Sequence, residues 1–247
     1  MTTAATAPPT TVMTTVVDLW IIRTDQPAPV VARLRRLLDR TECDRATPGS
    51  DPVRADRFTV LHGAVRLLAG ERLGIAADAL VWRHGPHGKP EPDHNGTGHD
   101  LRLSYSGSAA LAVLALTRGR RVGADVEELR DERVAARLAG RYFPDPDVRH
   151  IAGAGTAAGR SDRFTRLWCR REAVVKAYGG RLAQGLGLRL AGESPLLLPE
   201  VGTLGDGACR VADVPVPGAF RAAVAVEGDQ PFRIVRRLWH ADPTLVS

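Results

Sequence analysis

The sequence predicts an α+β protein built from two halves of comparable length. Helical and strand-like patterns are mixed in both halves, and the strand-like runs are too few and too short for a doubly wound sheet. A break falls near residues 117–120, so we expect a first half at 16–118 and a second half at 119–247. Residues 1–15, rich in Thr, Ala and Pro and without Lys or Arg, predict a disordered tail.

The first half is expected to begin with a buried strand at 16–22, where VVDLWII is largely apolar. A helix is predicted at 30–38, because Val and Leu recur there at helical spacing with arginines on the other face. A second helix is predicted at 53–73, ended by Gly74. The Gly- and Pro-rich stretch 84–100 predicts a loop.

The middle and the end of the chain supply the remaining elements. Strands are predicted at 101–104, 111–116, 122–127, 220–227 and 232–239. Helices are predicted at 130–141 and 162–178, the second capped by Ser161 and closed by Gly179 and Gly180, with a small-residue linker at 151–159 between them.

The composition of the chain excludes several classes of protein. The chain of 247 residues is 25% charged and 44% hydrophobic, which is typical of a globular protein rather than a disordered or fibrous one. No run of about 18 apolar residues or secretory signal is visible, and the three cysteines are scattered. We therefore expect a cytoplasmic protein without a membrane span or a disulfide framework. The net charge of +6 favours anionic partners.

Two carboxylates share one face of the strand predicted at 122–127. Asp125 and Glu127 are two residues apart, so their side chains point the same way, about 7 Å apart along the strand. This arrangement suits a hard cation bound by both. The alternative is an ordinary solvated strand face.

A second group lies on the helix predicted at 162–178. Trp168, Glu172 and Lys176 recur every four residues and therefore share a face. Trp168 would pack the helix against the body of the protein and project Glu172 from the same side. The alternative is a surface Glu–Lys pair beside a core tryptophan.

Two short motifs indicate an anion site. Lys89 in GKP can reach an anion, and the small residues around Ser104 in LSYSG would let the backbone approach a phosphate. A polar turn is the alternative for the second motif. The nearby histidines are irregularly spaced and do not indicate a zinc site: His84, His87, His94 and His99.

Taken in order, GKP, LSYS, GADVE and WCRREAVVKAYGG resemble the motifs of the 4'-phosphopantetheinyl transferases, of the long, surfactin-synthetase-activating type. The stretch RYFPDPD between the last two motifs is also similar. The resemblance covers about residues 53–190. It implies a monomer of two similar halves (a pseudo-dimer), each a small, mostly antiparallel sheet packed by helices, with the active site in the cleft between them.

The resemblance also implies the reaction. Coenzyme A (CoA) would donate its phosphopantetheine arm to a serine of an apo acyl or peptidyl carrier protein, acidic around that serine, and 3',5'-ADP would leave. Asp125, Glu127 and Glu172 would hold Mg²⁺, and Glu172 would be the base, directly or through a metal-bound water. Catalysis would also involve Lys176.

Further residues are implied in CoA binding. Lys176 and Arg171 would screen the phosphates, and Lys89, Ser104 and Arg57 match positions that contact CoA. Tyr105 stands where the family usually has histidine, and Arg171 where it has lysine. Tyr105 would give CoA a neutral hydrogen bond in place of an imidazolium charge.

Two other functions remain open from the sequence. A nucleic-acid-binding regulator would account for the basic charge, but no nucleic-acid-binding motif supports it. Another Mg²⁺-dependent phosphoester enzyme would account for the carboxylates but not for the ordered motif set. We therefore expect neither nucleic acid nor a membrane as a partner.

Overall fold

The computed structural model describes residues 14–47, 49, 51–93 and 100–241. The first half contains β1 (Thr15–Arg23), α1 (Ala28–Arg35), α2 (Arg40–Arg45), α3 (Pro52–Leu73), β2 (Trp82–His84), β3 (Pro90–Pro92), β4 (Leu101–Ser108) and β5 (Leu111–Arg118). The second half contains β6 (Val122–Glu128), α4 (Glu132–Tyr142), α5 (Asp145–Ala152), α6 (Ala157–Tyr178), α7 (Leu182–Gly185), β7 (Leu196–Leu198), β8 (Cys209–Val214), β9 (Phe220–Glu227) and β10 (Phe232–Trp239).

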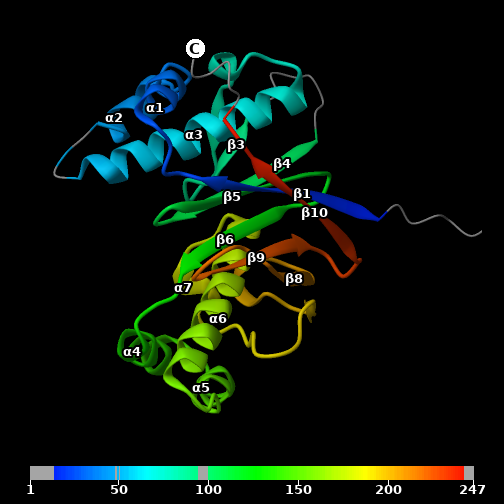
Figure 1. Ribbon diagram of the computed structural model, residues 1–247. Helices are drawn as coiled ribbons and strands as arrows, with labels where there is room; N and C mark the ends of the chain where they lie inside the picture. The colour runs from blue at the N-terminus through cyan, green and yellow to red at the C-terminus, as the bar shows by residue number, and fades with distance from the viewer. Residues whose placement is uncertain (1–13, 48, 50, 94–99, 242–247) are drawn as a thin grey trace, which may run out of the picture.

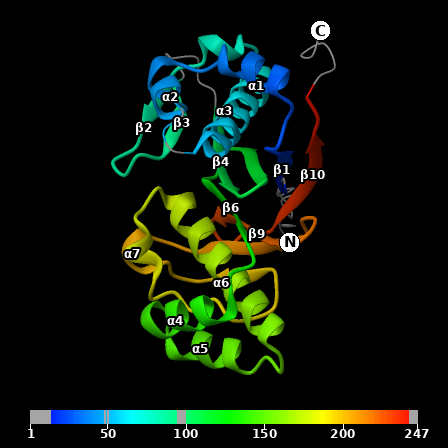
Figure 2. The ribbon, with the colours of Figure 1, turned by 60° about the vertical axis from the view of Figure 1, so that its left-hand side comes forward.

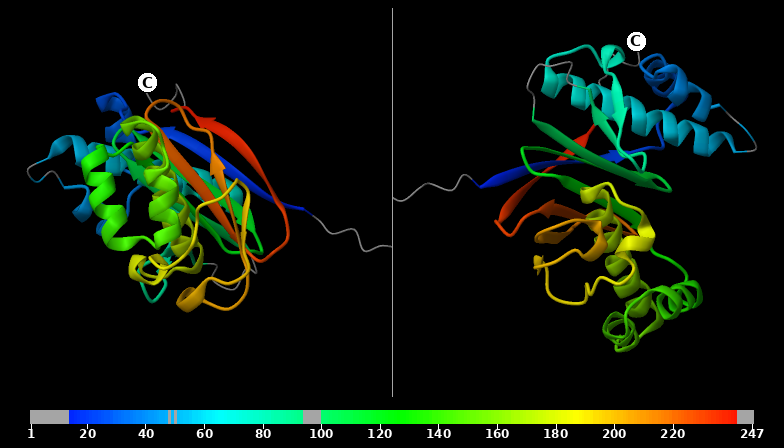
Figure 3. Two further views of the ribbon diagram at one scale, coloured as in Figure 1. Left: turned by 90° about the horizontal axis from the view of Figure 1, so that it is seen from below. Right: turned by 180° about the vertical axis from the view of Figure 1, so that it is seen from behind.

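Two four-stranded sheets stack on each other, and helices cover both outer faces (Figure 1). The first sheet has the order β10-β1-β5-β4, and the second has the order β6-β9-β8-β7. All pairs are antiparallel except β1 with β10, which are parallel. Seen from behind, the layers run helix, sheet, sheet, helix (Figure 3). The expected α+β class is confirmed.

Alternation of side chains along the strands builds the core between the sheets. On β1, Val17, Leu19 and Ile21 point inward against Val122, Ala124 and Val126 of β6 and its neighbours. The opposite face of the first sheet packs on α1 and α3, and the outer face of the second sheet packs on α6. Because both sheets are covered on both faces, strand β5 is buried along almost its whole length.

The last strand crosses between the halves expected from the sequence. Although β10 follows the second sheet in the chain, it pairs with β1 in the first, from Thr15↔Phe232 to Ile22↔Trp239. Sequence patterns do not show which strands pair with each other, so the pairing of the first strand with the last is visible only in the structure. Thr15, expected in the tail, begins β1; residues 1–13 of that tail lie outside the described part of the chain.

Several local predictions need correction. The expected linker 151–159 contains the end of α5 and the start of α6, and α6 is capped by Thr156 rather than Ser161. Ser161 lies inside α6 and donates its hydroxyl to the carbonyl of Arg130. The 84–100 loop contains part of the β2–β3 hairpin. Helices α2, α5 and α7 and strands β7 and β8 were not predicted, because each is short.

Glycine permits the close packing of β6 on α6. A Cβ on Gly123 would lie 1.9 Å from the carbonyl oxygen of Ala173 and 2.4 Å from the amide of Ala177. Any side chain would therefore push the strand away from the helix. The glycine of GADVE thus places Asp125 and Glu127 against the face of α6 that carries Glu172 and Lys176.

None of the helices in the described part of the chain combines the length and apolar character needed to cross a membrane.

Candidate functional site

An acidic cluster forms where β6 meets α6. Asp125 is 2% exposed, and its Oδ1 accepts hydrogen bonds from the Lys176 ammonium at 2.6 Å and from the Ser106 hydroxyl at 2.8 Å. Glu127 accepts from Ser108 and from Arg130, both at 3.0 Å. The expected shared face of Asp125 and Glu127 is present, since both reach serines of the same neighbouring strand, β4.

The serines of β4 join the two sheets at this point. Ser104, Ser106 and Ser108 alternate along the strand, so all three face β6. Ser104 accepts from the amide of Ala124, and Ser108 accepts from the amide of Glu128. These bonds fix the register of β4 against β6 and orient both carboxylates of the GADVE motif.

Burial, together with charge repulsion within the cluster, raises the pKa of two carboxyl groups. Burial raises the pKa of Glu127, and the neighbouring charge of Asp125 adds to it. Burial also raises the pKa of Glu172, again with a contribution from Asp125. The acidic neighbours raise the pKa of Lys176 despite its burial, so Lys176 remains a cation beside Asp125. The pKa values of Glu127, Glu172 and Lys176 therefore depend on the charges of their neighbours in the cluster.

The donor chemistry of this cluster suits Mg²⁺, which prefers carboxylate oxygens. Asp125 Oδ2 is buried and has no hydrogen-bond partner among the described residues, so one oxygen is available to a cation. No group of three His, Cys, Asp or Glu side chains within the described ranges is arranged to hold a metal ion. Binding by all three carboxylates would therefore require their side chains to rearrange.

A pocket of about 490 Å³ opens beside the cluster. Lys89, Ser104, Tyr105 and Lys176 line it, together with Gly179 and Gly180 at the end of α6. The structure thus brings four of the expected binding residues to one cavity. Figure 2 shows the β2–β3 hairpin extending toward the lower half beside this region.

Lys89 connects the two halves within this pocket. Its ammonium donates to the carbonyls of Val122 at 3.0 Å and Ala177 at 3.2 Å. Burial lowers the pKa of Lys89 to about 8, partly opposed by the charge of Glu91. Tyr105 remains a neutral phenol, because burial raises its pKa further above the ordinary value. In this conformation Lys89 holds the end of α6 against β6.

The structure places Arg171 and Arg57 away from the pocket. Arg171 is fully buried, and its guanidinium binds Asp147 at 2.9 Å and the carbonyls of Gly185 and Leu188. Its expected contact with phosphates is therefore not supported, because the side chain points into the core. Arg57 does not line the pocket, and its charge acts instead on Asp25. Its Nε has no hydrogen-bond partner in the described part of the chain.

Replacing Arg171 with lysine should test this structural assignment. Lysine keeps the charge but loses the fork that binds Asp147 and two carbonyls, and the stacking on Phe143 at 3.9 Å. We expect the free energy of unfolding to fall by about 2 kcal/mol, measured by urea denaturation, with no change in the KM for CoA, the substrate that the sequence resemblance implies. Arg149→Lys, at an exposed position of α5, is the control. A raised KM without loss of stability would place Arg171 at the ligand instead.

The sequence interpretation missed Ser108 and His62 near the pocket, and it included Ser106 only as a small residue of the LSYSG motif. Ser106 and Ser108 were detectable from the two-residue spacing of serines in LSYSGS, which predicts one shared strand face. His62, which lines the pocket from α3, gave no signal, because a single histidine in an apolar stripe is usually a core residue. His84 and His87 also line the pocket, whereas His94 and His99 lie outside the described residues.

Comparisons with known proteins bear on this site. A family model described as the 4'-phosphopantetheinyl transferase superfamily matches residues 121–202, which include Asp125, Glu127, Glu172 and Lys176. The chain is 29% identical over 177 residues to the 4'-phosphopantetheinyl transferase HetI of Nostoc sp., covering 72% of this chain and 74% of that protein. It is 28% identical over 170 residues to a Synechocystis sp. protein provisionally named 4'-phosphopantetheinyl transferase, covering 68% and 67% of the two chains. These similarities support a transferase enzyme of this kind, and favour neither a nucleic-acid-binding regulator nor another phosphoester enzyme.

Proposed function

We propose that this protein transfers the phosphopantetheine arm of CoA to a serine of an apo carrier protein, as a monomeric cytoplasmic enzyme of the long, two-half type. The observation that carries the proposal is the meeting of an acidic cluster and a cationic pocket at one place, between elements of both halves. The stacked sheets and the position of the pocket are compatible with the pseudo-dimer and cleft that this type implies.

In the proposed reaction, the serine hydroxyl of the carrier attacks the phosphorus that bears the pantetheine arm. A bond forms between the serine oxygen and phosphorus, the bond to the bridging oxygen breaks, and 3',5'-ADP leaves with that oxygen. Glu172 accepts the serine proton, directly or through water. Its raised pKa, caused by burial and by Asp125, makes it a stronger base than an exposed glutamate.

The cationic residues of the pocket would bind the diphosphate. Lys176, held beside Asp125, is placed to balance negative charge as the bridging oxygen leaves. Asp125, Glu127 and Glu172 would hold Mg²⁺, which supplies charge neutralisation on the diphosphate oxygens when bound. Ser104, Tyr105 and Lys89 line the cavity and would contact the remainder of CoA.

Mass spectrometry of an apo carrier protein incubated with this protein, CoA and Mg²⁺ tests the function. We expect a mass gain equal to the phosphopantetheine arm, lost on addition of EDTA and restored by excess Mg²⁺. Separate incubations with fatty-acid, polyketide and peptide-synthetase carriers would identify the substrate class. Hydrolysis of CoA without modification of any carrier would contradict the proposal and favour a phosphoester hydrolase.

A further inference from the structure

Each carboxylate of the GADVE motif is held by one of its two oxygens. Oδ1 of Asp125 accepts from a serine of β4 and from Lys176. In the same way, Oε2 of Glu127 accepts from Ser108 of β4 and from the guanidinium of Arg130, both at 3.0 Å. Each of the two carboxylates therefore has one positively charged partner within the protein.

These two positive charges account for the arrangement of the acidic cluster. Asp125, Glu127 and Glu172 are not grouped to hold a metal ion in the part of the chain that the structure describes. Two of the three negative charges are instead balanced by Lys176 and Arg130. A divalent cation that uses Glu127 therefore has to compete with Arg130 for the charge of this carboxylate.

Of the two basic partners, Arg130 is held less firmly. Its side chain is 47% exposed and that of Glu127 is 19% exposed, so water screens this ion pair. Asp125 is 2% exposed, and Lys176 donates both to it and to Ser106. Since water readily replaces a partner at an exposed pair but not at a buried one, the release of Arg130 costs less than the release of Lys176.

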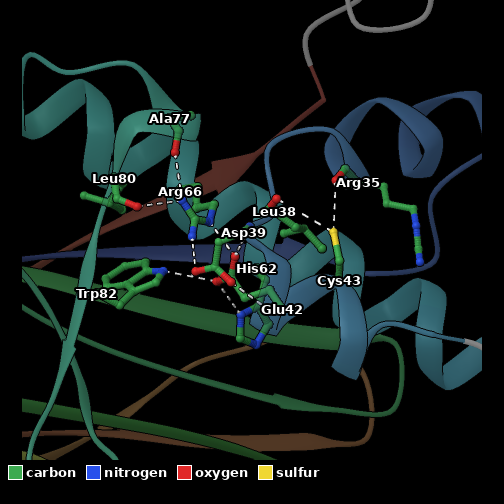
Figure 4. A network of polar contacts seen from close by, with 10 residues as sticks. All are labelled: Arg35, Leu38, Asp39, Glu42, Cys43, His62, Arg66, Ala77, Leu80 and Trp82. Carbon is green, nitrogen blue, oxygen red and sulfur yellow. Dashed lines mark hydrogen bonds and ion pairs between the residues drawn. The ribbon is translucent and has the colours of Figure 1, made fainter.

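The network around Glu42 shows the contrasting case of a carboxylate with a buried partner (Figure 4). Arg66 is fully buried, and its guanidinium donates to Glu42, to Asp39 and to two backbone carbonyls. Separating this arginine from its carboxylates would leave a buried charge without compensation. Arg130 has a single acidic partner among the described residues and a half-exposed side chain, so water can solvate its guanidinium after release.

The backbone of Arg130 is fixed although its side chain is exposed. Its carbonyl accepts from the hydroxyl of Ser161, and its amide donates to Thr165 Oγ1 at 3.5 Å. Both hydroxyl residues are buried on α6. Residue 130 therefore keeps its place beside the cluster when the guanidinium leaves Glu127, so the side chain can return.

We propose that Arg130 competes with a divalent cation for Glu127 and is the exchangeable counter-ion of the acidic cluster. The inference rests on the function proposed above, in which Glu127 helps to hold Mg²⁺. A guanidinium and a divalent cation bind the same negative charge and repel each other, so each weakens the binding of the other. Arg130 therefore sets the concentration of divalent cation at which the cluster becomes occupied.

Titration with Mn²⁺, in the absence of CoA and carrier, tests the competition. Mn²⁺ prefers the same oxygen ligands as Mg²⁺, and its free concentration can be measured by electron paramagnetic resonance. We expect Arg130→Gln to lower the Kd for Mn²⁺ by a factor of about 3 to 5, the size expected for loss of an exposed ion pair. Arg130→Lys, which keeps the charge, should stay within 1.5-fold of the wild type. Arg137→Gln, at an exposed position of α4, is the matched control and should leave the Kd unchanged.

A double-variant cycle shows whether the effect passes through Glu127. In Glu127→Gln the charge for which the two cations compete is absent, so adding Arg130→Gln should change the Kd by less than 1.5-fold. A gain as large as in the wild-type background would overturn the inference. If Glu127→Gln binds Mn²⁺ too weakly to measure, Glu127 is a ligand, and the comparison of Arg130→Gln with Arg137→Gln decides between a direct contact and a general effect of charge.

The outcomes separate this inference from the proposed function. An unchanged or higher Kd for Arg130→Gln, or an equal gain for Arg137→Gln, would overturn the competition. If neither the wild type nor Arg130→Gln binds Mn²⁺ while the wild type modifies a carrier, the inference fails and the function stands. If the wild type modifies no carrier although Arg130→Gln binds Mn²⁺ more tightly, the proposed function fails and the competition stands.

Discussion

Replacing Asp125 with asparagine is expected to reduce carrier modification by about a thousandfold. Asp125 is the centre of the acidic cluster: one oxygen binds Lys176 and Ser106, and the other is buried without a partner in the described part of the chain. Asparagine has nearly the same shape but lacks the charge. It therefore weakens the hold on Lys176 and removes the carboxylate proposed to bind Mg²⁺.

The measurement is the single-turnover rate of carrier modification at saturating CoA, followed by mass spectrometry. Glu128→Gln is the matched control, because Glu128 lies on the same strand, is exposed, and follows the residues of the cluster. We expect this control to keep the wild-type rate. A rate for Asp125→Asn within threefold of the wild type would exclude Asp125 from both charge balance and metal binding.

Replacing Glu172 with glutamine should lower kcat by a factor of about 100 to 10,000, the range expected for loss of a general base. The amide occupies the same volume but accepts no proton at neutral pH. Burial and the charge of Asp125 raise the pKa of Glu172, which means that its ionised form is disfavoured in the folded protein. Removing this charge should therefore not lower the melting temperature.

A fall in kcat with an unchanged or higher melting temperature would identify Glu172 as a residue kept for chemistry rather than for stability. Titration with CoA in the absence of both carrier and Mg²⁺ should give an affinity near that of the wild type. Glu200→Gln, an exposed residue far along the chain from the cluster, controls for loss of one negative charge. If Glu172→Gln retains the wild-type kcat, another group takes the serine proton.

The sequence predicted the fold class and much of the chemistry of the site. It could do so because the local sequence patterns are strong in the segments that carry them. Short, largely apolar runs identify β1, β4, β5, β6, β9 and β10, and long amphipathic runs identify α3 and α6. Asp125 and Glu127 were expected on one strand face, and both bond to serines of β4. Such predictions succeed because strand and helix geometry fixes which neighbouring side chains point together.

The environments of Glu172 and Arg171 show what the sequence could not determine. They are adjacent, and helix geometry separates them by about 100° around α6. The spacing alone does not say that Glu172 faces the carboxylates of β6 while Arg171 enters the core to bind Asp147. The pairing of β10 with β1 is equally hidden, because it joins residues more than 200 positions apart.

By itself, the sequence determined the residue types of the site, their order and the elements that carry most of them, since these depend on local spacing. Only the tertiary structure decided which charges face one another. It placed Lys176 on Asp125, turned Arg171 and Arg57 away from the pocket, and brought His62 from α3 to Tyr105 on β4. The physical reason is that burial and electrostatic coupling arise from contacts between segments distant in the chain, which no local periodicity encodes.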